Sequence, residues 1–187
     1  MYNQIKKKGG GVTMPQGIAI VGLNGSGKTT LGRGLAERLG YYRMDVEDYY
    51  FPKSDVPYAV ARTREEVERL MLADIKEHGD FILSAACADF AAIEPFYELI
   101  VYLEAPQNER MERIRQRSVD KFGSRVLPGG DMYEQEESFF AFAAKRTPDK
   151  IEKWIKTAAC PVLRIDSTRA VDEIAAEIMC KLVEDNK

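Results

Sequence analysis

An apolar run followed at once by a glycine-rich segment limits most strongly what this chain can fold into. Residues 17–21 (GIAIV) are apolar and branched, and residues 22–29 (GLNGSGKT) match G-x-x-x-x-G-K-[ST] at every fixed position. A leucine then recurs every four residues from 31 to 39, and Gly40 follows. This order predicts a buried strand, a tight loop and a helix over 28–39. Such a loop turns its backbone N–H groups towards an anion at the helix N-terminus.

Each residue type in this loop has a chemical reason to be there. The Lys28 side chain is expected to reach the β and γ phosphates of a nucleotide, and the Thr29 hydroxyl is expected to ligate Mg²⁺. The candidate nucleotide-binding residues are Gly22, Asn24, Gly25, Ser26, Gly27, Lys28, Thr29 and Thr30. The alternative is a glycine-rich turn that binds nothing. With a strand before it and a helix after it, the segment predicts a nucleoside triphosphate site.

Strands and helices alternate along the rest of the chain. A capping box at 63–66 (TREE) predicts the start of a helix that ends near 78, and residues 118–130 are polar and loop-like. Further strands are expected at 41–45, 81–83, 99–103 and 160–165, and further helices at 106–117, from 131, from 147 and over 171–182. Alternation of this kind predicts an α/β fold whose parallel sheet is covered by helices on both faces.

Composition excludes several classes of protein. The 187 residues carry 27 Lys and Arg against 30 Asp and Glu, a net charge of −3, which argues against a nucleic-acid polymer or an anionic membrane as partner. Three cysteines and one histidine argue against a disulfide scaffold or structural zinc, and no apolar run approaches the roughly 20 residues of a membrane span. We therefore expect a cytoplasmic monomer or homodimer, with a flexible leader at 1–16 and a single domain at 17–187.

From residue 17 to residue 183 the chain resembles the nucleoside-monophosphate-kinase group of P-loop proteins, which includes adenylate, shikimate and gluconate kinases. The resemblance implies a three-layer P-loop NTPase fold with a mostly parallel five-stranded sheet. It also implies an acceptor-binding segment at about 45–78 and a short arginine-bearing lid insert at about 118–131. The implied activity is ATP- and Mg²⁺-dependent transfer of a phosphoryl group to a small-molecule acceptor.

Arginines near the expected lid support this resemblance. Arg110, Arg113 and Arg117 share one helix face, and the last two match the R-x-x-x-R pattern with which the group holds phosphates. Arg146 follows the next helix, where the resemblance implies another phosphate-facing arginine. Phosphoryl transfer needs such cations because negative charge spreads over the equatorial oxygens in the transition state. The alternative is a solvated helix on which Glu109 and Arg113 form a surface pair.

Acidic residues follow the second expected strand, at the sheet edge where doubly wound folds bind ligands. Asp45-x-Glu47 resembles the D-x-D of shikimate-type kinases, in which the first acid helps to hold Mg²⁺ and the second takes the proton of the acceptor hydroxyl. Thr29 and Asp45 are therefore the candidate metal ligands, and Asp45 joins Lys28 and the arginines as a candidate catalytic residue. The candidate acceptor-binding residues are Glu47, Asp48, Arg62 and Asp89. The alternative is a polar loop that caps a helix.

The chain departs from the group at the third strand. Ser84 stands where adenylate kinases carry Asp, and residues 85–88 (AACA) stand where shikimate kinases carry three glycines. Asp89 is near enough to take either role, and Glu104 is a formal match for the acid that ends an apolar strand. An adenylate-kinase-like nucleoside monophosphate kinase is the first expectation. A shikimate- or gluconate-type kinase acting on a hydroxyl compound, and a nucleotide-binding regulatory NTPase without a small acceptor, stay open.

Overall fold

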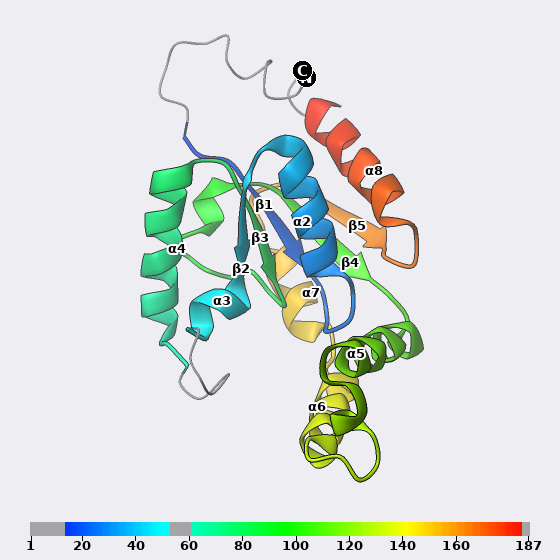
Figure 1. Ribbon diagram of the computed structural model, residues 1–187. Coiled ribbons are helices and arrows are strands. Elements are labelled where there is room, and N and C mark those ends of the chain that lie inside the picture. The colour runs from blue at the N-terminus through cyan, green and yellow to red at the C-terminus, as the bar shows by residue number, and fades with distance from the viewer. Residues whose placement is uncertain (1–13, 53–60, 185–187) are drawn as a thin grey trace.

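A five-stranded parallel sheet forms the centre of the molecule (Figure 1). The computed structural model describes residues 14–52 and 61–184, so most of the predicted leader and residues 53–60 of the acceptor segment lie outside the described residues. The strand order is β2-β3-β1-β4-β5. The strands are β1 (Gly17–Val21), β2 (Tyr42–Asp45), β3 (Phe81–Ala85), β4 (Tyr97–Glu104) and β5 (Val162–Asp166). All four pairings are parallel, which confirms the predicted sheet.

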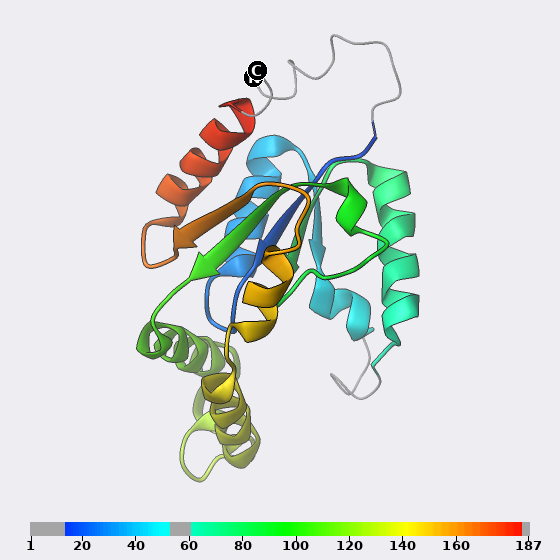
Figure 2. The same cartoon turned by 180° about the vertical axis from the view of Figure 1, so that it is seen from behind.

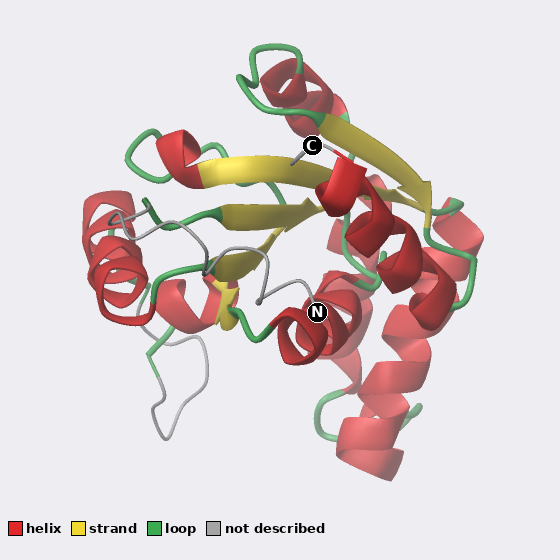
Figure 3. Ribbon diagram, turned by 90° about the horizontal axis from the view of Figure 1, so that it is seen from above, coloured by secondary structure: helices red, strands yellow, loops and turns green. Residues whose placement is uncertain are grey.

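Helices cover both faces of the sheet (Figure 3). On one face α2 (Lys28–Leu39) and α8 (Val171–Glu184) pack on Ile18 and Ile20. On the other face, seen in Figure 2, α4 (Arg64–His78) and α7 (Asp149–Ile155) pack on the side that carries Ala19 and Val21. Successive residues of a strand point to opposite faces, so the unbroken apolar run of β1 supplies both cores. The three layers are those expected from the sequence.

The predicted helix starts and ends are local features, and the structure reproduces two of them closely. Helix α2 covers the predicted residues, and Gly40 ends it in a left-handed conformation with φ 70°. Helix α4 begins with the predicted capping box, in which Thr63 Oγ1 accepts from the Glu66 N–H and the Glu66 carboxylate accepts from the Thr63 N–H. Short helix α3 (Val46–Tyr50) follows β2 at the start of the predicted acceptor segment.

A helical hairpin projects beyond the carboxyl ends of the strands (Figure 1). It consists of α5 (Gln107–Phe122), the 3₁₀ turn η2 (Gly123–Val126) and α6 (Tyr133–Lys145). Residues 118–122 were expected to lie in a loop, and that expectation is wrong because they continue α5. The buried hydroxyl of Ser118 donates to Glu136 of α6, and Ile114 packs on Phe140, so α6 supports the last turns of α5. Helix α5 ends only where Gly123 adopts φ 62°.

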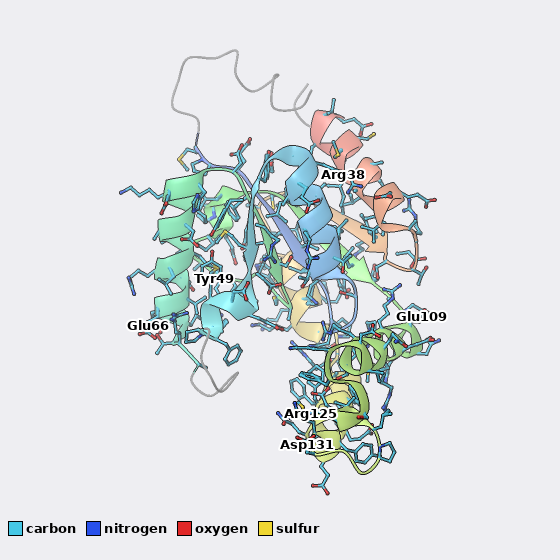
Figure 4. All side chains as sticks on the ribbon, viewed as in Figure 1. Arg38, Tyr49, Glu66, Glu109, Arg125 and Asp131 are labelled. Carbon is cyan, nitrogen blue, oxygen red and sulfur yellow. The ribbon has the colours of Figure 1, made fainter. Side chains whose placement is uncertain are left out.

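The far end of the hairpin is closed by a surface ion pair. Arg125 and Asp131 lie side by side there, 2.7 Å apart between Nη2 and Oδ2 (Figure 4). The helix that was expected from residue 131 begins at Tyr133, because Met132 occupies the cap position of α6 and Asp131 binds Arg125. No helix within 14–52 and 61–184 is long and apolar enough to cross a membrane.

Candidate nucleotide-binding site

The phosphate loop joins β1 to α2 and touches the base of the hairpin. Gly25 and Gly27 adopt positive φ values of 82° and 90°, which glycine tolerates best. A Cβ on Gly25 would lie 2.3 Å from the backbone oxygen of Arg110 in α5, so no larger residue fits there. Ser26 is fully buried inside the loop. The loop is therefore a tightly packed turn against which α5 rests.

Lys28 folds back over the loop. Its Nζ donates to the backbone oxygen of Leu23 at 3.0 Å. Burial lowers the pKa of Lys28 to about 8; Glu47 and Asp45 oppose this shift, whereas Arg146 and Arg117 add to it. These four residues come from β2, α3, α5 and the position directly after α6, and each was singled out from the sequence. The fold thus brings the predicted cations and acids together around one lysine amine.

This lowered pKa predicts that nucleotide affinity depends on pH. Lys28 is charged below pH 8 and loses its proton above it, whereas phosphate oxygens bind only the charged amine well. We expect the affinity for MgATP to fall roughly tenfold or more between pH 7.5 and pH 9.5, measured by isothermal titration calorimetry. Lys28→Arg keeps its charge throughout and should flatten the profile. An equal decline in wild type and variant would mean that Lys28 is not the titrating group.

Thr29 and Asp45 form a ready pair of oxygen ligands. Thr29 Oγ1 donates to Asp45 Oδ2 at 3.0 Å, and Asp45 also caps α3 by accepting from the Glu47 N–H at 3.2 Å. Hydroxyl and carboxylate oxygens suit Mg²⁺, which is commonly held by one or two carboxylates together with substrate phosphates. Among the described residues no group of three or more His, Cys, Asp or Glu is placed to hold a metal. The pair therefore fits an ion shared with a nucleotide.

Asn24 in the loop binds arginines from both ends of the hairpin. Its side-chain oxygen accepts from Arg146 Nη1 at 2.9 Å, and its backbone oxygen accepts from Arg110 Nη1 at 3.1 Å. Arg110 is only 5% exposed. Its helix spacing placed it on the face of Arg113 and Arg117, but the sequence carried no signal that it would be buried against the loop. It is the functional candidate that sequence reasoning missed.

Arg113 and Arg117 lie further along α5. Arg113 Nη2 donates to the backbone oxygen of Ser167, which follows β5, at 2.9 Å. Both arginines line a groove of about 490 Å³ whose walls also include Glu109, Glu112, Gln116 and Asp120. Figure 4 shows Glu109 near the start of α5, beside the sheet. All of these lining residues belong to α5 and three of them are carboxylates, so the groove itself does not reach the phosphate loop. Of the two arginines, Arg117 is the one that lies near enough to Lys28 to help lower its pKa, whereas Arg113 is held at Ser167.

The predicted acceptor-binding residues separate into two places. Glu47 lies near Lys28, and Asp48 is exposed on α3. Arg62 donates to the backbone oxygen of Tyr49 at 2.8 Å, so its guanidinium ties the residues just before α4 to α3. Tyr49 in turn donates to Asp74 of α4, which fixes α3 against that helix (Figure 4). Arg62 therefore has a structural contact beside any role in binding.

Asp89 pairs with two cations and not with Thr29. Its carboxylate is 3.0 Å from Lys150 Nζ and 3.9 Å from Arg64 Nη1. Burial alone would raise the pKa of Asp89, but Lys150 and Arg64 lower it below the ordinary value. Two cations, one from α4 and one from α7, thus surround Asp89 on the segment that leads from β3 to β4. Asp45, and not Asp89, is the acid that contacts Thr29.

Ser84 lies beside Asp45 in the sheet, and packing explains why this position carries a small serine. The two residues are paired across β2 and β3, and Ser84 is 2% exposed. Its Oγ donates to the backbone oxygen of Lys28 at 3.3 Å, and a Cβ on Gly32 would lie only 2.6 Å from that Oγ. A larger acid at this position would press on α2. Glu104, the other formal match, is exposed and pairs with Arg164 at 3.2 Å.

Comparison with known proteins identifies relatives of this chain. A family model described as "AAA domain" matches residues 18–137. The uncharacterized protein YqaC of Bacillus subtilis is 32% identical over 169 residues, covering 86% of this chain and 93% of YqaC. A cytidylate kinase of Natronomonas pharaonis is 32% identical over 111 residues, covering 54% of this chain and 57% of that kinase.

Solved structures agree on the fold. A gluconokinase from Sinorhizobium meliloti superposes with a TM-score of 0.55 at 15% identity, covering 91% of this chain and 93% of its own. A shikimate kinase from Acinetobacter baumannii, in complex with shikimate, gives 0.52 at 22% identity, covering 94% and 96%. Both are P-loop small-molecule kinases. The chain therefore belongs to the family described as AAA domain and has the α/β fold of P-loop small-molecule kinases.

Proposed function

We propose that this protein transfers the γ-phosphoryl group of ATP, with Mg²⁺, to a small-molecule acceptor. The observation that carries the proposal is the Thr29–Asp45 contact of 3.0 Å beside a phosphate loop whose Lys28 is flanked by Arg117 and Arg146. A bare anion-binding turn needs the loop and the lysine but no carboxylate paired with its threonine. The kinase-like fold and the similarity to a cytidylate kinase support the same conclusion.

Each group has a role in this proposal. Lys28, Arg113, Arg117 and Arg146 supply positive charge to the phosphate oxygens, where negative charge builds up during transfer. Thr29 and Asp45 hold Mg²⁺, which when bound neutralises charge on the phosphate oxygens of the nucleotide. The backbone N–H groups of the loop orient the phosphates, and the hairpin over the site excludes water. These contributions position and stabilise the reacting groups rather than bonding to them covalently.

A nucleoside monophosphate is the first acceptor that we propose. The similarity to a cytidylate kinase supports it, and a phosphate acceptor needs no general base. A hydroxyl compound is the second candidate, because Glu47 lies near Lys28 and carries a carboxylate able to take a proton. A regulatory NTPase without a small acceptor was suggested by the absence of an acid at 84. The packing of Ser84 against α2 explains why position 84 carries no acid. Asp45, which is paired with Ser84 on the neighbouring strand β2, carries a carboxylate at the same edge of the sheet.

The acceptor is tested by a transfer screen with ATP labelled in its γ-phosphoryl group. The panel contains AMP, CMP, GMP and UMP as one set, and shikimate, gluconate and other hydroxy acids as the other. We expect label to move to a nucleoside monophosphate, detected by thin-layer chromatography. Transfer to a hydroxy acid instead would favour the second candidate. Release of phosphate that no compound stimulates would contradict transfer to a small acceptor.

The cellular location and the oligomeric state are the last parts of this proposal. The net charge of −3 underlies the cytoplasmic, polymer-free and membrane-free expectation. Monomer and homodimer are both compatible with a site built within one chain. Size-exclusion chromatography with light scattering distinguishes them.

A further inference from the structure

Asn24 is the point at which the phosphate loop meets both ends of the hairpin. Arg110 lies in the first turns of α5, and Arg146 is the residue that directly follows the last turn of α6. The Asn24 backbone oxygen binds the first arginine and its side-chain oxygen binds the second. One loop residue thus ties the start and the end of the hairpin to the phosphate-binding backbone, and only one of the two ties depends on the asparagine side chain.

The contact with Asn24 places the Arg146 guanidinium at the loop lysine. The charge of Arg146 is one of the causes that lower the pKa of Lys28, so the two cations lie near one another. On its other side the guanidinium lies over the Phe142 ring, with Cζ 5.8 Å from the ring centroid. A free arginine samples many rotamers, and fixing it in one of them costs conformational entropy. A side chain already held by Asn24 and Phe142 loses less freedom when a phosphate arrives.

An amide suits this task better than a charged partner. A guanidinium has five N–H donors, so a single bond to Asn24 Oδ1 leaves donors for phosphate oxygens. A carboxylate at position 24 would bind Arg146 more strongly, but it would add negative charge where phosphate must enter. The neutral oxygen therefore orients the arginine without neutralising it.

We propose that Asn24 is a positioning residue whose side chain aims Arg146 at the γ-phosphoryl group of the nucleotide. This inference rests on the proposed function, since it needs a nucleotide in the loop. It goes beyond that function by assigning the Asn24 side chain to the γ-phosphoryl group, whereas the loop backbone serves the other phosphates. The Asn24 side chain then acts on affinity only when something occupies the γ position, and only through Arg146.

Binding measurements test this without knowledge of the acceptor. The two probes are MgADP alone and MgADP with beryllium fluoride, which occupies the γ-phosphoryl position. Calorimetry compares wild type with Asn24→Ala, Arg146→Ala and the double variant. Asn24→Ala keeps the backbone oxygen that Arg110 binds, so it removes one tie only. Asn108→Ala and Arg69→Ala, both at exposed helical positions away from these contacts, are the matched controls, and thermal unfolding verifies that each variant is folded.

We expect Asn24→Ala to weaken the beryllium fluoride complex about tenfold and MgADP less than about twofold. Arg146→Ala should weaken the same complex at least as much, and the double variant should bind like Arg146→Ala. The inference would be overturned if Asn24→Ala weakened the binding of both probes equally. It would also be overturned if Asn24→Ala weakened the beryllium fluoride complex as much in the Arg146→Ala background as it does in the wild type. If Arg146→Ala bound the beryllium fluoride complex with wild-type affinity, the inference would also be overturned, although the proposed nucleotide site would stand. A wild-type protein that binds neither probe would instead refute the proposed function itself.

Discussion

Replacing Lys28 by methionine is expected to lower phosphoryl transfer about 10³-fold while the protein stays folded. Methionine has a similar length and no charge, so it keeps the packing around the loop but cannot stabilise the phosphate oxygens. Burial already lowers the pKa of Lys28 to about 8, which means that the folded protein holds this charge at a cost. The variant should therefore unfold at the same temperature as wild type or at a higher one.

This combination separates catalysis from stability in one variant. Transfer is measured with the acceptor found in the screen, and unfolding by circular dichroism. Lys153→Met is the matched control, because Lys153 is exposed on α7 and should tolerate the same change in both assays. Full transfer activity in Lys28→Met would refute the proposed mechanism. A large drop in the unfolding temperature would show that Lys28 serves the fold rather than the nucleotide.

Replacing Asp45 by asparagine is expected to reduce transfer about 10²–10³-fold and to raise the Mg²⁺ concentration needed for half-maximal rate. Asparagine keeps an oxygen that caps α3 and accepts from Thr29, so the local fold survives. What it loses is the negative charge that attracts the metal ion. The rate is measured across a Mg²⁺ titration, because a metal ligand moves its midpoint and a purely structural residue does not.

A comparison of acids tests this assignment. Asp172→Asn, an exposed position on α8 that pairs with Arg38, should leave the Mg²⁺ midpoint unchanged. An unaltered midpoint in Asp45→Asn would mean that another acid completes the metal shell. Asp89 is a poor substitute in this structure because Lys150 and Arg64 already neutralise it.

Local signals in the sequence predicted much of the fold. The capping box at Thr63 and the glycine after Leu39 each act within a few residues, so helices α2 and α4 begin or end where expected. The prediction of a loop was wrong for residues 118–122, because α6 supports the end of α5 and a contact between two helices is not visible in either segment alone. Periodicity and capping describe one element at a time, whereas this extension depends on its neighbour.

The candidate site also combines features that local sequence predicts with features that depend on contacts between distant residues. The loop pattern predicts which residues would surround bound phosphates, and the fold brings Asp45 to Thr29 at the carboxyl edge of the parallel sheet. The burial of Arg110 against the loop depends on how the hairpin sits on β4 and the loop, which no spacing reveals. The pairing of Asp89 with Lys150 joins residues 61 positions apart, and sequence alone offered no reason to link them. The roles of these residues in catalysis stay predictions until the variants are measured.

The contact between Gly32 and Ser84 has a consequence for how relatives should be compared. Helix α2 approaches β3 so closely at Gly32 that the two positions share one small volume. A relative with a bulkier residue at either position must therefore change the other position as well, or move the helix that begins at Lys28. An acid in place of Ser84 would thus come with a displaced α2 or a rearranged loop. These two positions should vary as a pair across the family, and together they mark which of its members place the acid on β2.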